Sequence, residues 1–257
     1  MAAKDVKEKT IIYCTDNSLP EKFIRRCQEL LLKATEGIPI VCVSQKPVDF
    51  GDVRIVVGEI GRSWLSLFKQ QDAGIAEAKT PVIAFAEHDC LYTREHFEFD
   101  PPDLETFWYN KNLWLGQWSD NAHPELKGMY SFWPNRTGQS QLIVGRDIAL
   151  QAYSEREALI EKGCLSRAVP AEPGHKKDEA LRLLEKLYDR ATREGDSHMI
   201  SGYLKEWVAK WTARYFETKI PNIDIRHGNN FSRGKRGWNR TYDLPGWGKL
   251  GDILSGT

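Results

Sequence analysis

One stretch near the middle of the chain restricts the possible folds more than any other. Val82 to Ala86 is an uninterrupted apolar run, and Glu87, His88 and Asp89 follow it directly. A run of Val, Ile, Ala and Phe without polar alternation is typical of a parallel strand covered on both faces. In open α/β sheets, ligands bind beyond the carboxyl ends of such strands. The pattern therefore predicts a buried central strand that carries two acids and a histidine to a binding edge.

This acidic triplet has two interpretations. Hard divalent cations take carboxylate oxygens and keep open positions for substrate phosphates, so Glu87 and Asp89 on a rigid strand suit a metal bound to a diphosphate. A surface turn with two solvated acids would have the same residues, because short motifs of this kind also arise by chance. The triplet alone leaves both interpretations open.

Strand and helix patterns alternate on the N-terminal side of the triplet, which is typical of a parallel sheet with crossover helices. Apolar runs predict short strands at Thr10 to Cys14, Ile40 to Val43 and Val53 to Val57. Helical spacing of apolar residues predicts one helix from Pro20 and another after Ser63 as its N-cap. We therefore predict an α/β fold.

The first predicted strand runs into Thr15, Asp16 and Asn17, and this turn is expected beside the acidic triplet. Such an arrangement is typical of nucleotide binding. Asp16 is either a contact to a ribose or base or the N-cap of the next helix. The sequence contains neither GxGxxG nor GxxxxGK[ST], which disfavours a common dinucleotide fingerprint and a P-loop.

Composition narrows the class of protein. The 257 residues are 41% hydrophobic, enough for a large core in one α/β domain. Lys+Arg and Asp+Glu are both 36, so any polyanion must be bound by a local patch. The five cysteines form no CxxC pair and no apolar signal segment opens the chain, which favours reduced thiols and disfavours zinc. No run approaches the roughly 18 apolar residues of a membrane span, so we expect a cytoplasmic protein.

The second half of the chain differs from the first in composition and in residue pattern. Arg94 to Glu105 is acidic around two prolines and is predicted to be a solvated loop. Thr106 to Trp133 is rich in aromatic residues, which predicts antiparallel strands whose rings pack in the core or present flat faces to sugars or bases. Gly138 to Asp147 predicts a strand that leads into a helix from Arg146. Amphipathic helices are predicted over 180–191 and from Met199.

The segment from Arg226 to Arg240 is locally basic, although the chain as a whole is neutral. It contains five Lys or Arg residues and no acids, and its glycines predict a loop whose backbone can approach a ligand closely. Arg forks match phosphate oxygens, and interleaved aromatic residues also suit a nucleic-acid strand. The loop thus indicates binding of a nucleotide diphosphate or of nucleic acid.

Three segments together resemble GT-A-fold, nucleotide-sugar-dependent glycosyltransferases, including family-two-like members of phage and bacterial genomes. They are Tyr-Cys-Thr-Asp-Asn at 13–17, Phe-Ala-Glu-His-Asp-Cys-Leu-Tyr at 85–92 and Asp-Ile-Arg-His-Gly-Asn-Asn-Phe-Ser at 224–232. The resemblance implies a single GT-A-like domain over 1–257. Its nucleotide-sugar half would be 1–115, with a mostly parallel Rossmann-like sheet. Its acceptor half would be 116–257, with a smaller antiparallel sheet and the basic loop.

The resemblance also implies roles for individual residues. Asp89, Glu87 and a late histidine, His227, would hold Mn²⁺ or Mg²⁺ against the diphosphate of a UDP- or GDP-sugar, although Glu87 could instead contact the ribose. The base that deprotonates the acceptor hydroxyl would be Asp196, with Glu194 as the alternative; Asp196 could instead cap the following helix. The remaining donor contacts would be Thr15, Asp16, Asn17, His88, Arg226, Asn229, Arg233, Lys235 and Arg236.

The sequence therefore predicts a metal-dependent hexosyltransferase that acts on a hydroxyl. The acceptor is expected to be a glycan or a hydroxymethyl-pyrimidine base of DNA, and in a phage protein the site of action would be the host cytoplasm. Two other classes use the same residues: a metal-dependent nuclease or phosphotransferase, and a non-catalytic module that binds nucleotides or nucleic acid.

Overall fold

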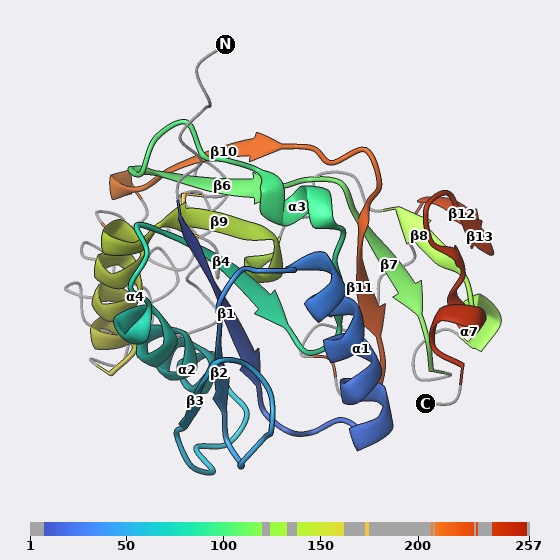
Figure 1. Cartoon of the computed structure of the whole chain (residues 1–257), viewed down its shortest axis with the longest axis horizontal. Coiled ribbons are helices and arrows are strands. Elements are labelled where there is room, and N and C mark those ends of the chain that lie inside the picture. Colours follow the sequence, from blue (N-terminus) through green and yellow to red (C-terminus); the bar gives the residue numbers. More distant parts are fainter. Residues whose placement is uncertain are drawn as a thin grey trace, which may run out of the picture.

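A mostly parallel β-sheet runs through the centre of the molecule, with helices on both faces (Figure 1). The computed structural model of the chain describes residues 8–119, 124–132, 138–161, 173–174, 207, 209–228, 230 and 238–255. Within these residues the large sheet has seven strands in the order β10-β6-β9-β4-β1-β2-β3. Its strands are β1 (Lys9–Thr15), β2 (Ile40–Ser44), β3 (Val53–Val56), β4 (Val82–Glu87), β6 (Thr106–Asn110), β9 (Leu142–Gly145) and β10 (Thr212–Phe216). Among these seven strands, β9 runs antiparallel to both of its neighbours.

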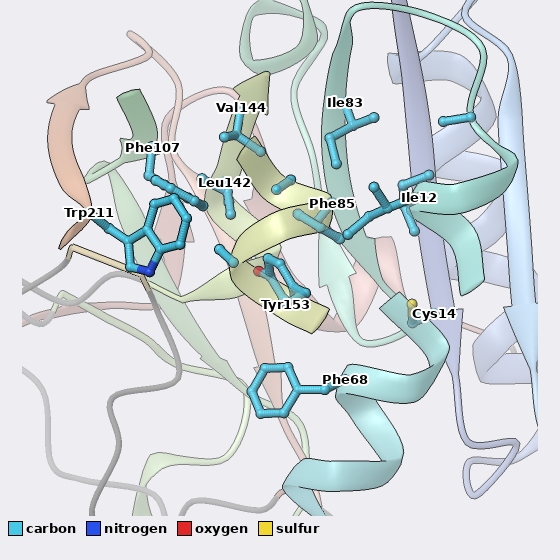
Figure 2. Packing of buried hydrophobic residues seen from close by; sticks show 14 of the residues in the cluster. Ile12, Cys14, Phe68, Ile83, Phe85, Phe107, Leu142, Val144, Tyr153 and Trp211 are labelled. Carbon is cyan, nitrogen blue, oxygen red and sulfur yellow. The ribbon is translucent and has the colours of Figure 1, made fainter. Parts of the chain in front are cut away.

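Side chains of the large sheet alternate between two apolar layers, as the pleat of a strand requires. Ile12 and Cys14 of β1 face a core that is closed by α2 (Trp64–Glu77) and α4 (Arg146–Glu161) (Figure 2). Ile11 and Tyr13 face the opposite core, against α1 (Glu21–Ala34) and α3 (Arg94–Glu98). The central strand β4 is buried on both faces, and this confirms the prediction from its apolar run.

A second, smaller sheet lies beside the first and is mostly antiparallel. In the described part of the chain its order is β12-β8-β7-β11-β5. Its strands are β5 (Cys90–Leu91), β7 (Leu113–Gln117), β8 (Tyr130–Phe132), β11 (Asn222–Arg226) and β12 (Trp238–Thr241). It packs against α1 and the C-terminal elements β13 (Asp243–Leu244) and α7 (Leu250–Ile253), and β14 (Gly248–Lys249) pairs with β13. Short 3-10 turns lie at Pro124–Leu126 and Gln139–Gln141.

Three strands of the large sheet continue directly into strands of the small one. β4 leads into β5, β6 into β7 and β10 into β11, each through a short connection. The two sheets therefore adjoin along one line, and the residues of the three connections lie on that line. His88 and Asp89 form the β4–β5 connection.

The predicted elements of the first half are present with shifts of one or two residues at their ends. Ser63 caps α2, since its hydroxyl accepts a hydrogen bond from the Ser66 backbone N–H (3.0 Å). The strand and helix predicted around Arg146 are β9 and α4.

Two predictions for the middle of the chain need correction. Arg94 to Glu105 is not all loop, because Arg94–Glu98 forms α3, where His96 and Phe97 are buried and Arg94 pairs with Glu98 (2.8 Å). The aromatic strands are not all antiparallel either: β6 runs parallel to β10, and β7 runs parallel to β11. Both errors arise because these elements are fixed by contacts with the distant segment 212–226.

Strands from both sides of residue 115 share each sheet, and the division of the chain there stays a prediction. No helix in the described residues is both long enough and apolar enough to cross a membrane.

Candidate functional site

The carboxyl ends of β1 and β4 bring the first two predicted segments together. The strands are parallel neighbours with Cys14 opposite Glu87, so the residues that follow each strand emerge side by side. The Thr15 hydroxyl lies 2.8 Å from Nδ1 of His88, and Asp16 Oδ1 lies 3.8 Å from the same nitrogen. The expected contact between the first βα turn and the acidic triplet is therefore confirmed.

The third segment arrives through the small sheet. β11 pairs antiparallel with β5, with Asp224 opposite Cys90, and the Ile225 N–H donates to the Asp89 carbonyl (2.8 Å). This register places His227, just beyond the end of β11, against the Asp89 side chain. Nε2 of His227 lies 3.0 Å from Oδ2 of Asp89, although the residues are 138 positions apart.

Asn230 fixes this histidine and carboxylate relative to each other. Its side-chain oxygen accepts a hydrogen bond from the His227 backbone N–H (2.6 Å), which orients its NH₂ group inward. That NH₂ group lies 3.0 Å from Oδ2 of Asp89 and 3.1 Å from Nε2 of His227. Asp89 and His227 are each only 8% exposed, so the pair is held in a nearly dry environment.

The geometry groups possible metal ligands in two ways. One atom each of His88, Asp89 and His227 lies within 4.8 Å of the others, and the same holds for Glu87, Asp89 and Cys90. Two ligand atoms that bind one cation at right angles, each about 2.1 Å from it, are about 3.0 Å apart. Asp89 Oδ2 and His227 Nε2 are separated by this distance in a hydrogen bond, so a metal ion bound by both residues would take the place of that hydrogen bond.

Electrostatics keep Asp89 ionised despite its burial. Burial raises the pKa of the Asp89 carboxyl, but the hydrogen bond from His227 and the charges of His88, His227 and Arg226 outweigh it and hold the pKa below the usual range. Burial also lowers the pKa of His88, against the opposing effect of Asp89 and Asp16. An ionised carboxylate and a neutral imidazole are the forms in which these side chains bind a metal ion.

Asp16 forms a second anionic point at the same edge. Its Oδ1 accepts a hydrogen bond from the Ser18 N–H (2.9 Å), and its Oδ2 pairs with Nε of Arg62. Burial raises the pKa of the Asp16 carboxyl, but the contacts with Ser18, His88 and Arg62 outweigh this and lower the pKa. The oxygen that is bonded to Ser18, Oδ1, is also the one that lies 3.8 Å from Nδ1 of His88, while Oδ2 is paired with Arg62.

Two of the predicted donor contacts also hold the scaffold. The Asn17 backbone has φ 57°, and its side-chain oxygen accepts hydrogen bonds from the N–H groups of Gln45 (3.0 Å) and Lys46 (2.9 Å). The Thr15 carbonyl accepts a hydrogen bond from the Gln70 side chain (2.8 Å). Asn17 therefore ties the turn after β1 to the turn after β2.

Arg226 sits at the end of β11 with its side chain 6% exposed, and it pairs with Asp224 at 3.3 Å. The sequence predicts contacts from Arg226 to donor phosphates. In the structure its charge acts on Asp224 and Asp89 inside the site.

Several predicted site residues lie outside the described part of the chain. They are Glu194, Asp196, Asn229, Arg233, Lys235 and Arg236. Their roles as base or as phosphate contacts stay predictions.

Sequence reasoning missed three residues that the fold brings to the site. Arg62 gave no signal because it lies in a loop whose path depends on tertiary contacts. Asn230 is part of the His-Gly-Asn-Asn motif, in which the sequence offered no means of choosing between Asn229 and Asn230. Tyr92 follows the triplet, and its hydroxyl accepts a hydrogen bond from the Glu87 backbone N–H (2.9 Å). That bond fixes the carboxyl end of β4.

Comparison with known proteins finds no matching family model and no matching curated protein. Among solved structures, a glycosyltransferase involved in the glycosylation of the major capsid of PBCV-1 overlaps with a TM-score of 0.34 at 14% identity. That overlap covers 59% of this chain and 66% of the other. The glycosyltransferase GlyE of Streptococcus pneumoniae TIGR4 gives a TM-score of 0.41 at 8% identity, over 81% of this chain and 45% of GlyE. Because these TM-scores are low, the function has to be inferred from the residues of the site itself.

Proposed function

We propose that the chain is a glycosyltransferase that moves a sugar from a nucleotide-sugar to a hydroxyl with the help of a divalent metal ion. One observation carries the proposal: the folded chain brings Asp89 and His227 to metal-ligand distance at the carboxyl edge that also holds Asp16. A cation site next to a hydrogen-bond acceptor for a ribose, at the end of parallel strands, suits a nucleoside diphosphate.

Different residues of this chain would bind different parts of the nucleotide-sugar donor. Asp89 and His227 would hold the metal, which supplies Lewis-acid stabilisation of the departing diphosphate when bound. Asp16 would accept hydrogen bonds from the ribose hydroxyls, since its Oδ2 is paired with the Arg62 side chain and not with the backbone. Arg62 would then turn its guanidinium to a donor phosphate, where charge builds as the nucleotide leaves.

The acceptor side is assigned to residues of the second half. Asp196, with Glu194 as the alternative, would take the proton from the attacking hydroxyl, as a carboxylate within hydrogen-bond reach can do. The new bond joins the acceptor oxygen to the anomeric carbon, the bond from that carbon to the diphosphate oxygen breaks, and the nucleoside diphosphate leaves. The basic segment from Arg226 to Arg240 would meet phosphates of the donor or of the acceptor.

Donor hydrolysis tests the proposal. The full chain would be incubated with UDP- and GDP-sugars and Mn²⁺, and the release of free nucleoside diphosphate would be measured. We expect slow release without any acceptor, and loss of that release in Asp89→Asn, because the variant lacks a carboxylate for the metal. Release of nucleotides from DNA or RNA with no hydrolysis of any sugar donor would instead identify a metal-dependent nuclease that uses the same residues.

The acceptor class needs its own measurement. A basic, glycine-rich segment with aromatic residues suits either a glycan or a DNA base that carries a hydroxymethyl group. Radiolabelled sugar would be offered with DNA that contains 5-hydroxymethylcytosine or 5-hydroxymethyluracil, and with small glycans. Labelled DNA, with less label in Arg236→Ala at low salt and a smaller difference at high salt, would indicate that the segment binds the acceptor. Labelled glycans alone would restrict the segment to the donor.

A further inference from the structure

The sequence and the structure indicate different residues as the third ligand of the proposed metal site. Resemblance assigns that place to Glu87. In the structure, Asp89 and His227 share their compact set with His88, whereas Glu87 groups with Asp89 and Cys90 and away from His227. A metal bound by the Asp89–His227 pair thus has the His88 imidazole in the same compact set, whereas Glu87 belongs to the set that lacks His227.

His88 is held in a fixed orientation for this role. The Thr15 hydroxyl contacts Nδ1 of His88 at 2.8 Å, so Nε2 is the nitrogen left for a ligand. Thr15 is itself fixed, because its hydroxyl accepts a hydrogen bond from the Asn17 N–H (3.1 Å) and its carbonyl accepts one from Gln70. A metal-binding histidine typically has its other ring nitrogen bonded in this way, which sets the tautomer and the ring plane.

The other two ligands are both contacted by Asn230. Asn230 binds the Asp89 carboxylate with its NH₂ group and the His227 backbone with its oxygen. The ring centroids of His88 and His227 lie 6.4 Å apart, and Nε2 of His227 lies 3.0 Å from Oδ2 of Asp89. Each of the three donors therefore has a polar neighbour that holds it in place.

We propose that His88, Asp89 and His227 form a metal site with two imidazole nitrogens and one carboxylate oxygen, and that this donor set favours Fe²⁺ or Co²⁺ over Mg²⁺. Mg²⁺ takes oxygen ligands almost exclusively, whereas the later divalent metals accept imidazole readily. This inference rests on the proposed function, which places a metal ion at this site. The preference among metals is predicted from the ligand atoms alone.

A simpler role for His88 is to orient Asp16, whose Oδ1 lies 3.8 Å from Nδ1. In that case the histidine would affect nucleotide binding and leave metal affinity unchanged. Metal binding measured without any nucleotide separates the two roles.

The experiment uses the full chain and metal ions alone. Co²⁺, Mn²⁺ and Mg²⁺ would be titrated by calorimetry, and the visible absorption of bound Co²⁺ would be recorded as a direct readout of its ligands. The variant is His88→Asn, with Thr15→Val to remove the hydroxyl that holds His88 and Thr15→Ser as its matched control. His96→Gln, which changes a histidine outside the site, controls for loss of any imidazole.

We expect wild-type protein to bind Co²⁺ at least about tenfold more tightly than Mg²⁺. His88→Asn should weaken Co²⁺ binding more than about tenfold and alter the Co²⁺ absorption, while Mg²⁺ binding changes much less. Thr15→Val should weaken Co²⁺ binding by a smaller factor, whereas Thr15→Ser and His96→Gln should match wild type. Wild-type Co²⁺ affinity and absorption in a folded His88→Asn, or equal affinity of wild type for Mg²⁺ and Co²⁺, would overturn the inference.

The outcome is separable from that of the proposed function. Metal-dependent hydrolysis of a sugar donor with metal affinity that does not depend on His88 would refute the ligand set and leave the transferase in place. Co²⁺ binding that depends on His88, without hydrolysis of any sugar donor, would support the ligand set and refute the transferase.

Discussion

The buried histidine His96 makes the fold sensitive to acid, and its surroundings determine the size of the effect. The His96 side chain is 0% exposed and stacks on Phe216 with ring centroids 5.7 Å apart. Nδ1 lies 3.4 Å from the Asn110 amide nitrogen, and Nε2 has no hydrogen-bond partner among the described residues. Burial lowers the pKa of His96 to about 3, with a smaller contribution from the charge of Lys9.

The sign of the effect comes from comparing the folded and unfolded chains. The unfolded histidine has the ordinary pKa of 6.5, so between pH 6.5 and about 3 the unfolded chain binds a proton that the folded chain does not. The stability associated with neutral His96 is thus complete above pH 6.5 and declines as the pH falls. Between pH 7.5 and pH 5 the loss amounts to about 2 kcal/mol of unfolding free energy.

Urea denaturation of wild type and His96→Phe at pH 7.5, 6 and 5 measures this loss. The phenylalanine keeps an aromatic ring against Phe216 but cannot titrate, so the variant should lose about 2 kcal/mol less than wild type between pH 7.5 and 5. Carboxylates titrate in both proteins and cancel in the difference. Phe216→Leu is the packing control, and it should be destabilised by the same amount at every pH. Parallel decline of wild type and His96→Phe would refute the reasoning.

Two further predictions concern substrate handling. Arg62→Ala should weaken UDP binding about tenfold and leave uridine binding nearly unchanged, because a charge-assisted bond to a phosphate is lost. Calorimetry with both ligands measures the two affinities. An equal loss of affinity for uridine would show that Arg62 only orients Asp16. Asp196→Asn should lower sugar transfer roughly a hundredfold with unchanged donor affinity if it is the base, whereas normal turnover with a lower melting temperature would identify it as a helix cap.

The first half of the fold was predictable from sequence because its signals are local. The apolar run of Val82 to Ala86 can be buried only between two layers, and Ser63 can be recognised as a cap from its position before an amphipathic segment. The approach of Thr15 to His88 is then expected from a general property of parallel sheets, in which consecutive βα turns share one edge.

The second half was less predictable because its signals are long-range. No strand is predicted at Asn222–Arg226, next to the basic loop, yet this segment is the wholly buried strand β11. Ile223 and Ile225 alternate with polar residues, which is a strand signal that the cluster of cations obscured. No local pattern states that this strand pairs with Cys90–Leu91, and only that pairing brings His227 to Asp89.

Because the site lies on the line between the two sheets, its geometry depends on how the two sheets pack against each other. Asp89 leaves the large sheet and His227 leaves the small one, so the distance between them depends on how closely β11 lies to its neighbours. Gly116 of β7 is paired with Ile225, and a Cβ atom at Gly116 would lie 2.9 Å from Cγ2 of Ile223 and 3.2 Å from Cδ1 of Ile225. The close packing that positions β11 therefore requires a glycine in the neighbouring strand.

Gly116→Val tests whether that packing sets the metal site. The added side chain must push Ile223 and Ile225 aside, and the movement of β11 would carry His227 away from Asp89. We expect Co²⁺ affinity to fall about tenfold or more, as for loss of a supporting contact of a ligand. Gly251→Ala, whose Cβ meets no atom within 4 Å, is the matched control and should bind Co²⁺ as wild type does. Unchanged Co²⁺ affinity in a folded Gly116→Val would mean that Asn230, which binds both Asp89 and His227, holds the ligands together without help from the sheet.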